Sequence, residues 1–390
     1  MNKNNKLSSA QSLHPDYSAR FSNHLLRTLI DLEEKDKNIA ISPARLQTVM
    51  VMLANWAMPH IQEGILERVG NDVITQDEAN ALSSKKMFEL TPADWCKDSE
   101  GNVVPTIEQQ AIMWVQKDLK VNKEAIANVS DDFALTLKPV DFATDLSSII
   151  DNAISEATHG LINHLDLELT KDTLALITDI LYFKGSWQEE FDDTRTREQL
   201  FYGTRGKAKV QMMKRTADMA YADMPRCQMV RLPYTCYDKE NRRFSMRIYL
   251  PKPKYSLQDV LRELWNNEFI CYTEEQEVKL SLPRFSVASR FDIQKLFEEL
   301  DLGSIFEITD IIPKCIKGLF ISQIKQQVKV NVDENGTEAA AVTYIPMCGC
   351  CPPEVKPEPV VMTVNRPFIF EIAEDTTNTI LFTGVINNVE

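Results

Sequence analysis

Alternating apolar residues in the second half of the chain constrain the fold more than any other feature. Apolar side chains occupy every second position in segments 244–250, 278–282 and 328–332. A period of two places these side chains on one face of a β-strand, so each of these strands is expected to bury one face. Two more apolar segments, 368–372 and 380–385, are expected to form a terminal strand pair.

The first half of the chain shows the spacing of amphipathic helices instead. Apolar residues recur every three or four positions over 17–32. Ser42 is expected to cap a second helix, with Pro43 at its first helical position. Further helices are expected around 146–158 and 256–265. Helices that precede strands predict an α+β fold with mostly antiparallel sheets.

Composition narrows the class of protein. The 390 residues contain no Gly/Ser-rich or charged run typical of a linker, so one domain over 1–390 is expected. No apolar run approaches the roughly 20 residues of a membrane-spanning helix, which predicts a soluble protein. A net charge of -14 argues against nucleic acid or an anionic membrane as the main partner.

A long segment near the C-terminus departs from both patterns. From Asp333 to Val364 the chain contains three consecutive alanines, three closely placed cysteines and five prolines. A loop of this length inside a compact domain is usually either functional or disordered.

The start of this segment, Glu334 to Thr343, has the composition of a strand that can insert into a sheet. Gly336 supplies a flexible pivot. In a strand, alternate residues from Thr337 onward face one way and are all small or apolar, and the first charge on the other face is Glu338. The alternative is a short alanine-rich helix or a solvated linker.

The same segment resembles the reactive-loop hinge of inhibitory serpins, and other motifs in family order cover nearly the whole chain. These motifs are Asn38–Pro43, the helical residues Ile150, Ile154, Thr158, Gly160 and Ile162, then Tyr182–Trp187, Leu232–Tyr234, Leu282–Phe285, Asn365–Phe368 and Phe382–Val385. The resemblance implies the serpin fold: a large central β-sheet with further sheets, about eight to nine helices, and an exposed reactive-centre loop at about 334–364.

The resemblance also implies a suicide inhibitor of serine, or of cysteine, endopeptidases and not an enzyme. In such inhibitors the protease cleaves the loop and stays bound as an acyl-enzyme, because the loop inserts into the central sheet as a further strand. Thr337 is expected to enter the sheet first after cleavage, so an arginine there should stop inhibition with little effect on the stability of the intact protein. The implied hinge comprises Glu334, Gly336, Thr337, Ala339, Ala340 and Ala341.

The polar cluster that the family places beneath the central sheet is altered in this chain. The implied gate to insertion comprises Ser42, Arg45, Asp179, Trp187 and Gln326, and only the serine keeps the family residue of the polar cluster. A buried arginine alone would be costly, but Arg45 and Asp179 could form a hydrogen-bonded pair. The alternative is that one or both point to water.

The family's spacing predicts the reactive bond. The residue before it lies sixteen positions after Glu334, which gives Cys350-Cys351. A small, weakly apolar cysteine suits protease pockets for small or medium apolar residues better than trypsin-like pockets. The alternative bonds are Met347-Cys348 and Tyr344-Ile345. Pro346 would remove a backbone hydrogen bond from an inserted strand.

Three loop cysteines, Cys348, Cys350 and Cys351, allow three interpretations. A metal site is disfavoured because all five histidines precede residue 165. Oxidation of an exposed thiol could act as a switch, and the third interpretation is three reduced cysteines. We therefore expect no metal and no cofactor. The expected partner is the target endopeptidase, bound covalently to a monomer.

A non-inhibitory serpin is the main alternative function: a carrier, a chaperone or a protease substrate. The altered polar cluster favours it, and the small hinge residues oppose it. An enzyme is poorly supported, because the chain has no phosphate-loop spacing, no H-E-x-x-H and no G-x-S-x-G.

The cellular compartment is predicted from the N-terminus and the cysteines. Residues 1–15 are polar and lack a stretch of signal-peptide length, and five of the eight cysteines stand singly, which favours the cytoplasm. The family's habit favours the extracellular space instead. A glycan on Asn335, which begins an Asn-x-Thr triplet, would oppose insertion of the hinge.

Overall fold

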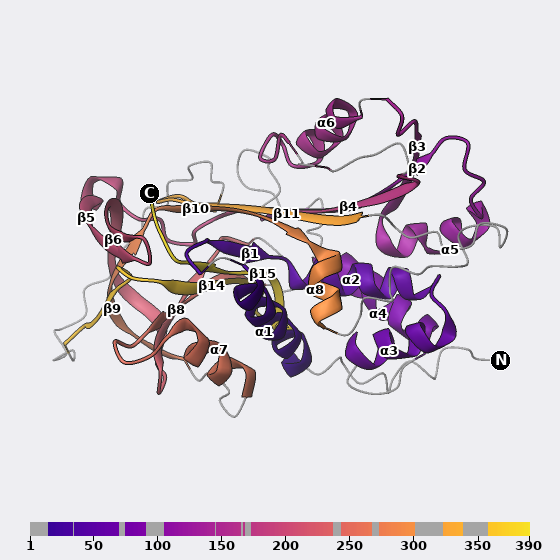
Figure 1. The fold of residues 1–390 in the computed structure, drawn as a ribbon. Helices are drawn as coiled ribbons and strands as arrows, with labels where there is room; N and C mark the ends of the chain where they lie inside the picture. The colour runs from indigo at the N-terminus through magenta and orange to yellow at the C-terminus, as the bar shows by residue number, and fades with distance from the viewer. Residues whose placement is uncertain are drawn as a thin grey trace.

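The computed structural model describes most of the chain, in two sheets surrounded by helices (Figure 1). The described residues are 15–33, 35–69, 75–90, 105–144, 146–164, 167, 173–236, 243–266, 273–300, 323–337 and 358–390. The helices in these ranges are α1 (Pro15–Leu32), α2 (Pro43–Ala54), α3 (Pro59–Val69), α4 (Gln76–Leu90), α5 (Lys123–Phe133), α6 (Ser147–Ala157), α7 (Leu257–Asn266) and α8 (Ile293–Glu299), with a single 3₁₀ turn, η2 (Asp193–Arg195).

The first sheet is a mixed, six-stranded sheet. Its strands, in spatial order, are β10 (Phe285–Asp292), β11 (Gln323–Val332), β12 (Gly336–Thr337), β4 (Ala175–Ser186), β2 (Thr106–Gln116) and β3 (Leu135–Val140). Strands β2 and β3 run parallel, as do β4 and β11, and the other neighbours are antiparallel.

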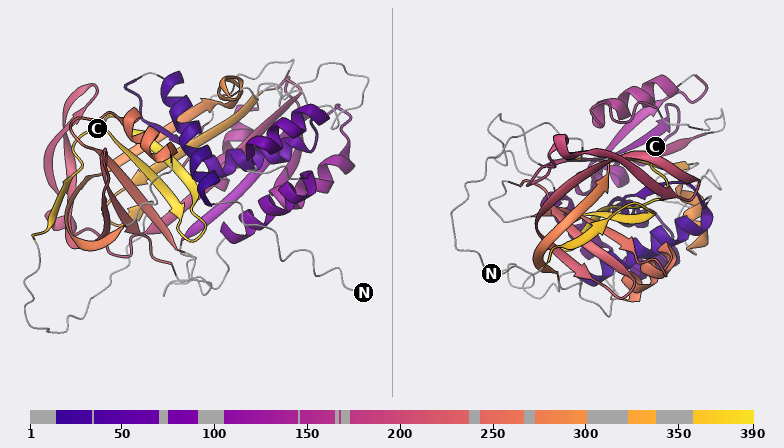
Figure 2. Two further views of the ribbon diagram at one scale, coloured as in Figure 1. Left: turned by 90° about the horizontal axis from the view of Figure 1, so that it is seen from below. Right: turned by 90° about the vertical axis from the view of Figure 1, so that its left-hand side faces the viewer.

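The second sheet has nine strands and packs below the first (Figures 1 and 2). Its order is β1 (Ile39–Ile41), β15 (Thr379–Ile386), β14 (Phe368–Glu374), β8 (Phe244–Pro251), β7 (Cys227–Pro233), β6 (Gly206–Asp223), β9 (Glu274–Pro283) and β13 (Val360–Thr363), with β5 (Arg197–Gly203) paired to β6. The two sheets and the helices confirm the α+β class.

The predicted helices are confirmed as α1, α2, α6 and α7. Ser42 occupies the N-cap position of α2, but its side chain makes no capping hydrogen bond, so its expected capping role is wrong. All residues of α2 are buried, not only one face. The reason is its position between the six-stranded sheet, the other helices and the end of β15 (Figure 1).

The predicted strands are also confirmed, as β8, β9, β11, β14 and β15. Single-face burial was right for β9 and wrong for β8, whose residues are buried on both faces except Arg247. The terminal pair β14 and β15 is likewise buried throughout. These strands lie in the middle of a sheet that is covered on both sides.

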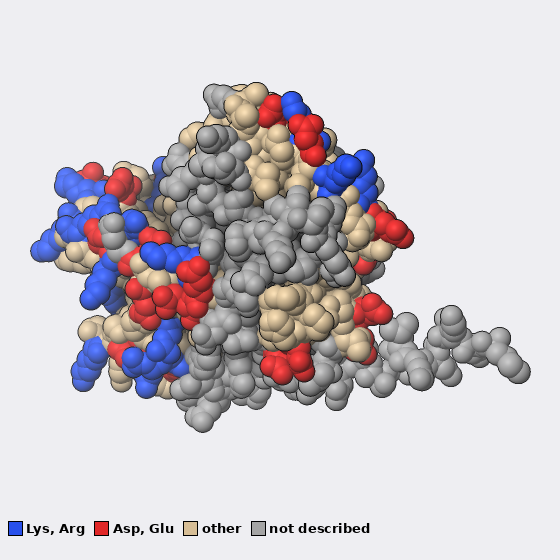
Figure 3. All heavy atoms as spheres, turned by 45° about the vertical axis from the view of Figure 1, so that its right-hand side comes forward, with Lys and Arg blue, Asp and Glu red and all other residues tan. Residues whose placement is uncertain are grey.

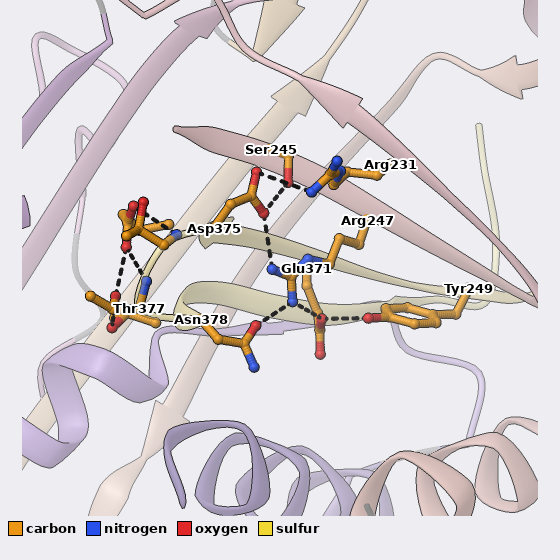
Figure 4. Close-up of polar contacts among 11 residues, drawn as sticks. Arg231, Ser245, Arg247, Tyr249, Glu371, Asp375, Thr377 and Asn378 are labelled. Carbon is orange, nitrogen blue, oxygen red and sulfur yellow. Dashed lines mark hydrogen bonds and ion pairs between the residues drawn. The ribbon is translucent and has the colours of Figure 1, made fainter. Parts of the chain in front are cut away.

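A buried polar network lies on β8 and β14 (Figure 4). The guanidinium of Arg247 lies 3.8 Å from the Glu371 carboxylate and donates a hydrogen bond of 3.0 Å to Asp375. Tyr249 donates to Glu371 at 2.8 Å, and Ser245 donates to Asp375 at 2.7 Å. Burial raises the pKa of Glu371, while the charge of Arg247 and the tyrosine hydrogen bond oppose that rise. The network compensates two carboxylates that the packing removes from water.

Surface charges of both signs are interspersed in the described part of the chain (Figure 3). Two ion pairs are examples: Lys209 with Glu198 within the β5–β6 hairpin at 2.6 Å, and Arg205 of the hairpin turn with Asp36, which lies between α1 and β1, at 2.7 Å. Each acidic partner partly cancels the local field of its basic neighbour. Within the described ranges, every helix is too short or too polar to cross a membrane.

Candidate functional site: the opening between β4 and β11

The two central strands of the six-stranded sheet separate along their length. At one end, Gln323–Gln326 of β11 pair directly with Leu176–Asp179 of β4. At the other end, the two-residue strand β12 lies between them and pairs with both. The sheet is therefore one strand wider at the hinge than at the opposite end.

Thr337 of the hinge is already part of this sheet in the intact chain. It pairs with Gly185 on β4 and with Val332 on β11, and only 2% of its surface is exposed. Its hydroxyl lies 2.7 Å from the hydroxyl of Tyr234. The expectation that Thr337 enters the sheet only after cleavage is wrong, because this hydrogen bond and two strand pairings hold it there beforehand.

Gly336 is required for a reason other than flexibility. A Cβ atom at this position would overlap the carbonyl oxygen of Gly185 and the backbone of Ser186. The close approach of β12 to β4 therefore needs a residue without a side chain.

Trp187 fixes the turn that precedes β12. Its indole N–H donates to the carbonyl oxygen of Asp333 at 3.0 Å, and its backbone N–H donates to that of Asn335 at 2.9 Å. Its ring stacks on Tyr234 at 4.6 Å with an interplanar angle of 13°. The half-buried Asn335 is thus held by the end of β4.

Glu334 is clasped by two residues from neighbouring segments. Arg284, between β9 and β10, donates from Nε to both carboxylate oxygens, at 2.9 and 2.7 Å, and Thr196 donates its hydroxyl. Burial raises the pKa of Glu334, but these hydrogen bonds outweigh it, so the pKa lies below its usual value. The hinge carboxylate is therefore charged when the clasp is closed.

A second polar cluster lies where β4 and β11 pair directly. Arg45 of α2 donates from Nε to Asp179 Oδ1 at 3.0 Å, and its Nη2 contacts the same oxygen. Their side chains are 1% and 0% exposed, so the buried pair is present and neither residue points to water. Burial raises the pKa of Asp179, and the charge and hydrogen bonds of Arg45 oppose that rise.

Gln326 and Ser42 complete this cluster through the backbone. The Ser42 N–H donates to Gln326 Oε1 at 2.9 Å, and Gln326 Nε2 donates back to the Ser42 carbonyl at 3.3 Å. Within the described residues, two buried oxygens of the cluster, Ser42 Oγ and Asp179 Oδ2, have no hydrogen-bond partner. Such atoms are uncommon in native proteins and call for an explanation.

The helix α6 and the segment after it cover the outer face of the opening (Figure 1). Isoleucines of α6 pack against β4 and β2. Beyond the helix, Lys329 of β11 donates to the carbonyl oxygen of Leu161 at 3.2 Å, and His159 lies 2.9 Å from Glu108 of β2. The segment after α6 is therefore attached to strands on both sides of the opening.

The structure thus divides the predicted site into two places. Ser42, Arg45, Asp179 and Gln326 lie together, and Trp187 lies at the other end with Glu334, Gly336 and Thr337. The remaining predicted residues lie outside the described residues: Ala339, Ala340, Ala341, Tyr344, Ile345, Met347, Cys348, Cys350 and Cys351. The loop expected over 334–364 has strand at both ends, because β12 and β13 lie within that range.

Sequence reasoning gave no role to Tyr234, Arg284 or Thr196, which hold the hinge. Tyr234 and Arg284 each follow a strand-ending Leu-Pro pair, and that repeated pattern is the only signal the sequence contains for them. Their pairing with the hinge depends on contacts between residues 50 to 138 positions apart.

A mixed sheet with a short hinge strand between two central strands, covered by a crossing helix, defines the class of serpin-like folds. A family model described as serpin (serine protease inhibitor) matches residues 16–389, and the chain belongs to this family. Serpins are generally protease inhibitors rather than enzymes, and conformational change is typical of their fold.

Known relatives agree with this assignment. The chain is 27% identical over 385 residues to Iripin-2 of Ixodes ricinus, which covers 95% of this chain and 92% of that protein. Its structure matches native, stressed Arabidopsis AtSerpin1 with a TM-score of 0.82 at 22% identity, covering 98% of this chain and all of the other. It also matches thyroxine-binding globulin in complex with thyroxine, with a TM-score of 0.76 at 22% identity, covering 96% and 99% of the two chains.

Proposed function

We propose that this serpin inhibits endopeptidases by inserting its cleaved loop between β4 and β11. The expected targets are serine endopeptidases, and cysteine endopeptidases are the alternative. The position of β12 carries this proposal, because the hinge already occupies the first two positions of the inserted strand. Residues 180–184 of β4 and 327–331 of β11 lie between β12 and the level where the strands pair directly. A strand that continues from Thr337 would pair with both.

The proposed trapping step is an interrupted peptide-bond cleavage. The protease's serine hydroxyl attacks the carbonyl carbon of Cys350, and its proton passes to the protease's general base. The bond to Cys351 breaks, and the new amino group leaves with a proton, which gives an ester between Cys350 and the serine. Insertion then moves the ester away from the protease's original docking position before water can hydrolyse it.

The proposed partner is therefore a protease with a pocket for a small or medium apolar side chain. The complex is expected to contain one copy of each protein, linked covalently. The single serpin domain over 1–390 supplies hinge, opening and loop, and the mechanism needs neither a metal nor a cofactor.

A matched pair of hinge variants tests inhibition. Wild type and Thr337→Ser should form complexes with a target protease that survive SDS and heat, because both side chains fit between Gly185 and Val332. Thr337→Arg should be cleaved at the same bond without forming a complex, because burying a long charged side chain at that position costs too much free energy. Mass spectrometry locates the bond.

Since Thr337 is buried before cleavage, Thr337→Arg should also destabilise the intact protein. If Thr337→Arg traps protease as efficiently as Thr337→Ser, inhibition does not proceed by insertion at this position. If wild type forms no complex with any protease of a broad panel, the inhibitory proposal is wrong.

A non-inhibitory role is the second candidate, favoured by one observation. Gln326 of β11 is hydrogen-bonded to the backbone of Ser42 where β4 and β11 must separate, beside the buried pair of Arg45 and Asp179, and separation would disturb this buried polar cluster. In that role the cleaved protein would gain no stability, which a denaturation curve before and after loop cleavage would show.

A further inference from the structure

A cavity of about 560 Å³ lies beside the junction of α5 and β3, on the face of the six-stranded sheet that α6 covers. Figure 1 shows α6 above and α5 below the labelled ends of β2 and β3. Ligand sites in proteins commonly have volumes of about 300–1,000 Å³, so this cavity is large enough for a small molecule. Among the residues that line it are Glu108 and Gln110 of β2, Asp131 of α5, Thr136 of β3, Ala157 of α6 and Ile180 of β4.

The cavity is apolar at its bottom and polar at its mouth. Gln110 and Ile180 are paired across β2 and β4, so they lie side by side on one face of the sheet. Ile180 is 5% exposed and Gln110 is half-buried, whereas Glu108, Asp131 and Thr136 are exposed. A ligand that fits this arrangement has a small apolar body and a polar end that stays near water.

Both charged residues of the lining, Glu108 and Asp131, are acidic. Within the described residues, the lining contains no lysine or arginine that would neutralise them. Carboxylates around a concave surface attract positively charged ligands. His159, which follows α6, lies 2.9 Å from Glu108 and offsets part of this charge when its imidazole is protonated. The cavity therefore favours a cation over a neutral or anionic ligand.

Two helix ends add to the negative potential of the cavity. Asp131 lies in the last turn of α5, and Ala157 is the last residue of α6. The C-terminal end of a helix carries partial negative charge from its carbonyl groups and favours cations nearby. Neither helix has a basic residue in its last turn, so neither compensates its own end.

Polar groups of the lining are available to a ligand without the loss of an existing contact. Across the described part of the chain, the side chains of Asp131 and Gln110 make no hydrogen bond or ion pair. A carboxylate and an amide oxygen can both accept hydrogen bonds from an ammonium group, and the bond to the carboxylate is the stronger of the two.

We propose that this cavity binds a small organic ammonium ion, with its charged group near Asp131 and Glu108 and its apolar part over Ile180. A bare metal ion fits less well, because the cavity is far larger than a single ion and the described residues contain no group of three side chains able to hold one. The proposal is independent of the inhibitory function, since no residue of the hinge or of the Arg45–Asp179 cluster lines the cavity.

Three probes with one apolar body test the preference for a cation. Calorimetry on the full chain near pH 7 compares 2-phenylethylammonium with the neutral 2-phenylethanol and the anionic 3-phenylpropionate. The ammonium ion should bind with a dissociation constant of about 1 mM or below, which is a modest affinity for its size. The alcohol should bind at least about tenfold more weakly, because it lacks the charge-assisted hydrogen bond to the carboxylate, and the anion should show no binding.

A matched pair of variants tests the contribution of Asp131. Asp131→Asn should weaken binding of 2-phenylethylammonium about five- to tenfold, because it removes the carboxylate at the mouth of the cavity. Asp132→Asn removes one charge from the same turn of α5 but lies outside the lining, so it should weaken binding less than about twofold. Because Asp131 is exposed, its substitution should leave the fold intact, which the Tm of the free variant checks.

Amide hydrogen exchange with mass spectrometry locates the bound probe. At a saturating concentration, 2-phenylethylammonium should slow exchange at least about twofold in segments 106–111, 130–136 and 154–160, which surround the cavity. The same concentration of calcium or magnesium chloride should leave these segments unchanged.

Each contrary result would overturn the proposal. Equal binding of the alcohol and the ammonium ion would show that charge plays no part. Equal losses for Asp131→Asn and Asp132→Asn would indicate a general field and not a contact. Protection confined to other segments would place the probe elsewhere, and equal protection by calcium or magnesium would indicate a metal site. If no binding is detected up to about 10 mM, the cavity does not take ammonium ions, whereas the inhibitory proposal would be unaffected.

Discussion

The hydrogen bond between Thr337 and Tyr234 predicts how firmly the hinge is held before any protease arrives. We consider Thr337→Val, which keeps the shape of the side chain and removes its hydroxyl. Both residues are buried, at 2% and 3% exposure, and the two oxygens lie 2.7 Å apart. The substitution therefore leaves the tyrosine hydroxyl in the interior without its partner.

The expected magnitude follows from that burial. Leaving a buried hydroxyl unsatisfied costs about 1–3 kcal/mol of unfolding free energy. With an unfolding entropy of about 2.1 cal/mol/K per residue, a chain of 390 residues has roughly 0.8 kcal/mol/K in total. Thr337→Val should thus lower the Tm of the intact protein by about 1–4 °C.

A double-mutant cycle read by thermal denaturation measures the bond. Tyr234→Phe should lower the Tm by a similar amount, and the double variant should lose less than the sum, because removing both partners leaves no orphaned group. Strictly additive losses, or two neutral single variants, would show that the hinge is not docked against Tyr234, and would contradict the position of β12.

Three further predictions concern the same site. Because the pKa of Glu334 is lowered in the folded protein, the stability from its clasp with Arg284 is present above the usual glutamate pKa of 4.5 and is lost as pH falls through the folded value. The free energy of unfolding, measured from pH 7 to pH 3.5, should therefore fall more for wild type than for Glu334→Gln, by about 1 kcal/mol or less because the arginine is partly exposed, which is about 1 °C or less in Tm. Arg45→Met should lower the free energy of unfolding, measured by chemical denaturation, by about 3–5 kcal/mol, because it leaves the buried Asp179 carboxylate without its ion-pair partner. Arg45→Met/Asp179→Leu should be close to neutral, and equal losses for the two variants would argue against a buried charge pair. Gly336→Ala should destabilise the intact protein by about 1–3 kcal/mol, because its Cβ overlaps the backbone of β4, and an unchanged Tm would show that β12 does not lie this close to β4.

Local patterns in the sequence were sufficient for the elements and for the class of fold. Apolar spacing located α1, α2, α6 and α7 and the C-terminal strands, because periodicity depends only on which residues must share a face. The insertable composition of the hinge was read from the same kind of pattern, and its alanines, Ala339 to Ala341, stay a prediction because they lie outside the described residues. Single-face burial failed for β8, because local periodicity does not show that a second layer covers the outer face.

The state of the hinge was decided only by the tertiary structure. Nothing local to Thr337 indicates that it is docked in the intact chain, because the contact comes from Tyr234, over a hundred positions earlier. The pairing of Arg45 with Asp179 was one of two sequence alternatives, and the packing of α2 against β4 selects it by excluding water from both side chains. Strand register, likewise, is fixed by which faces are buried across the sheet, so only the folded chain shows that Asp179 pairs with Gln326 and Thr337 with Gly185.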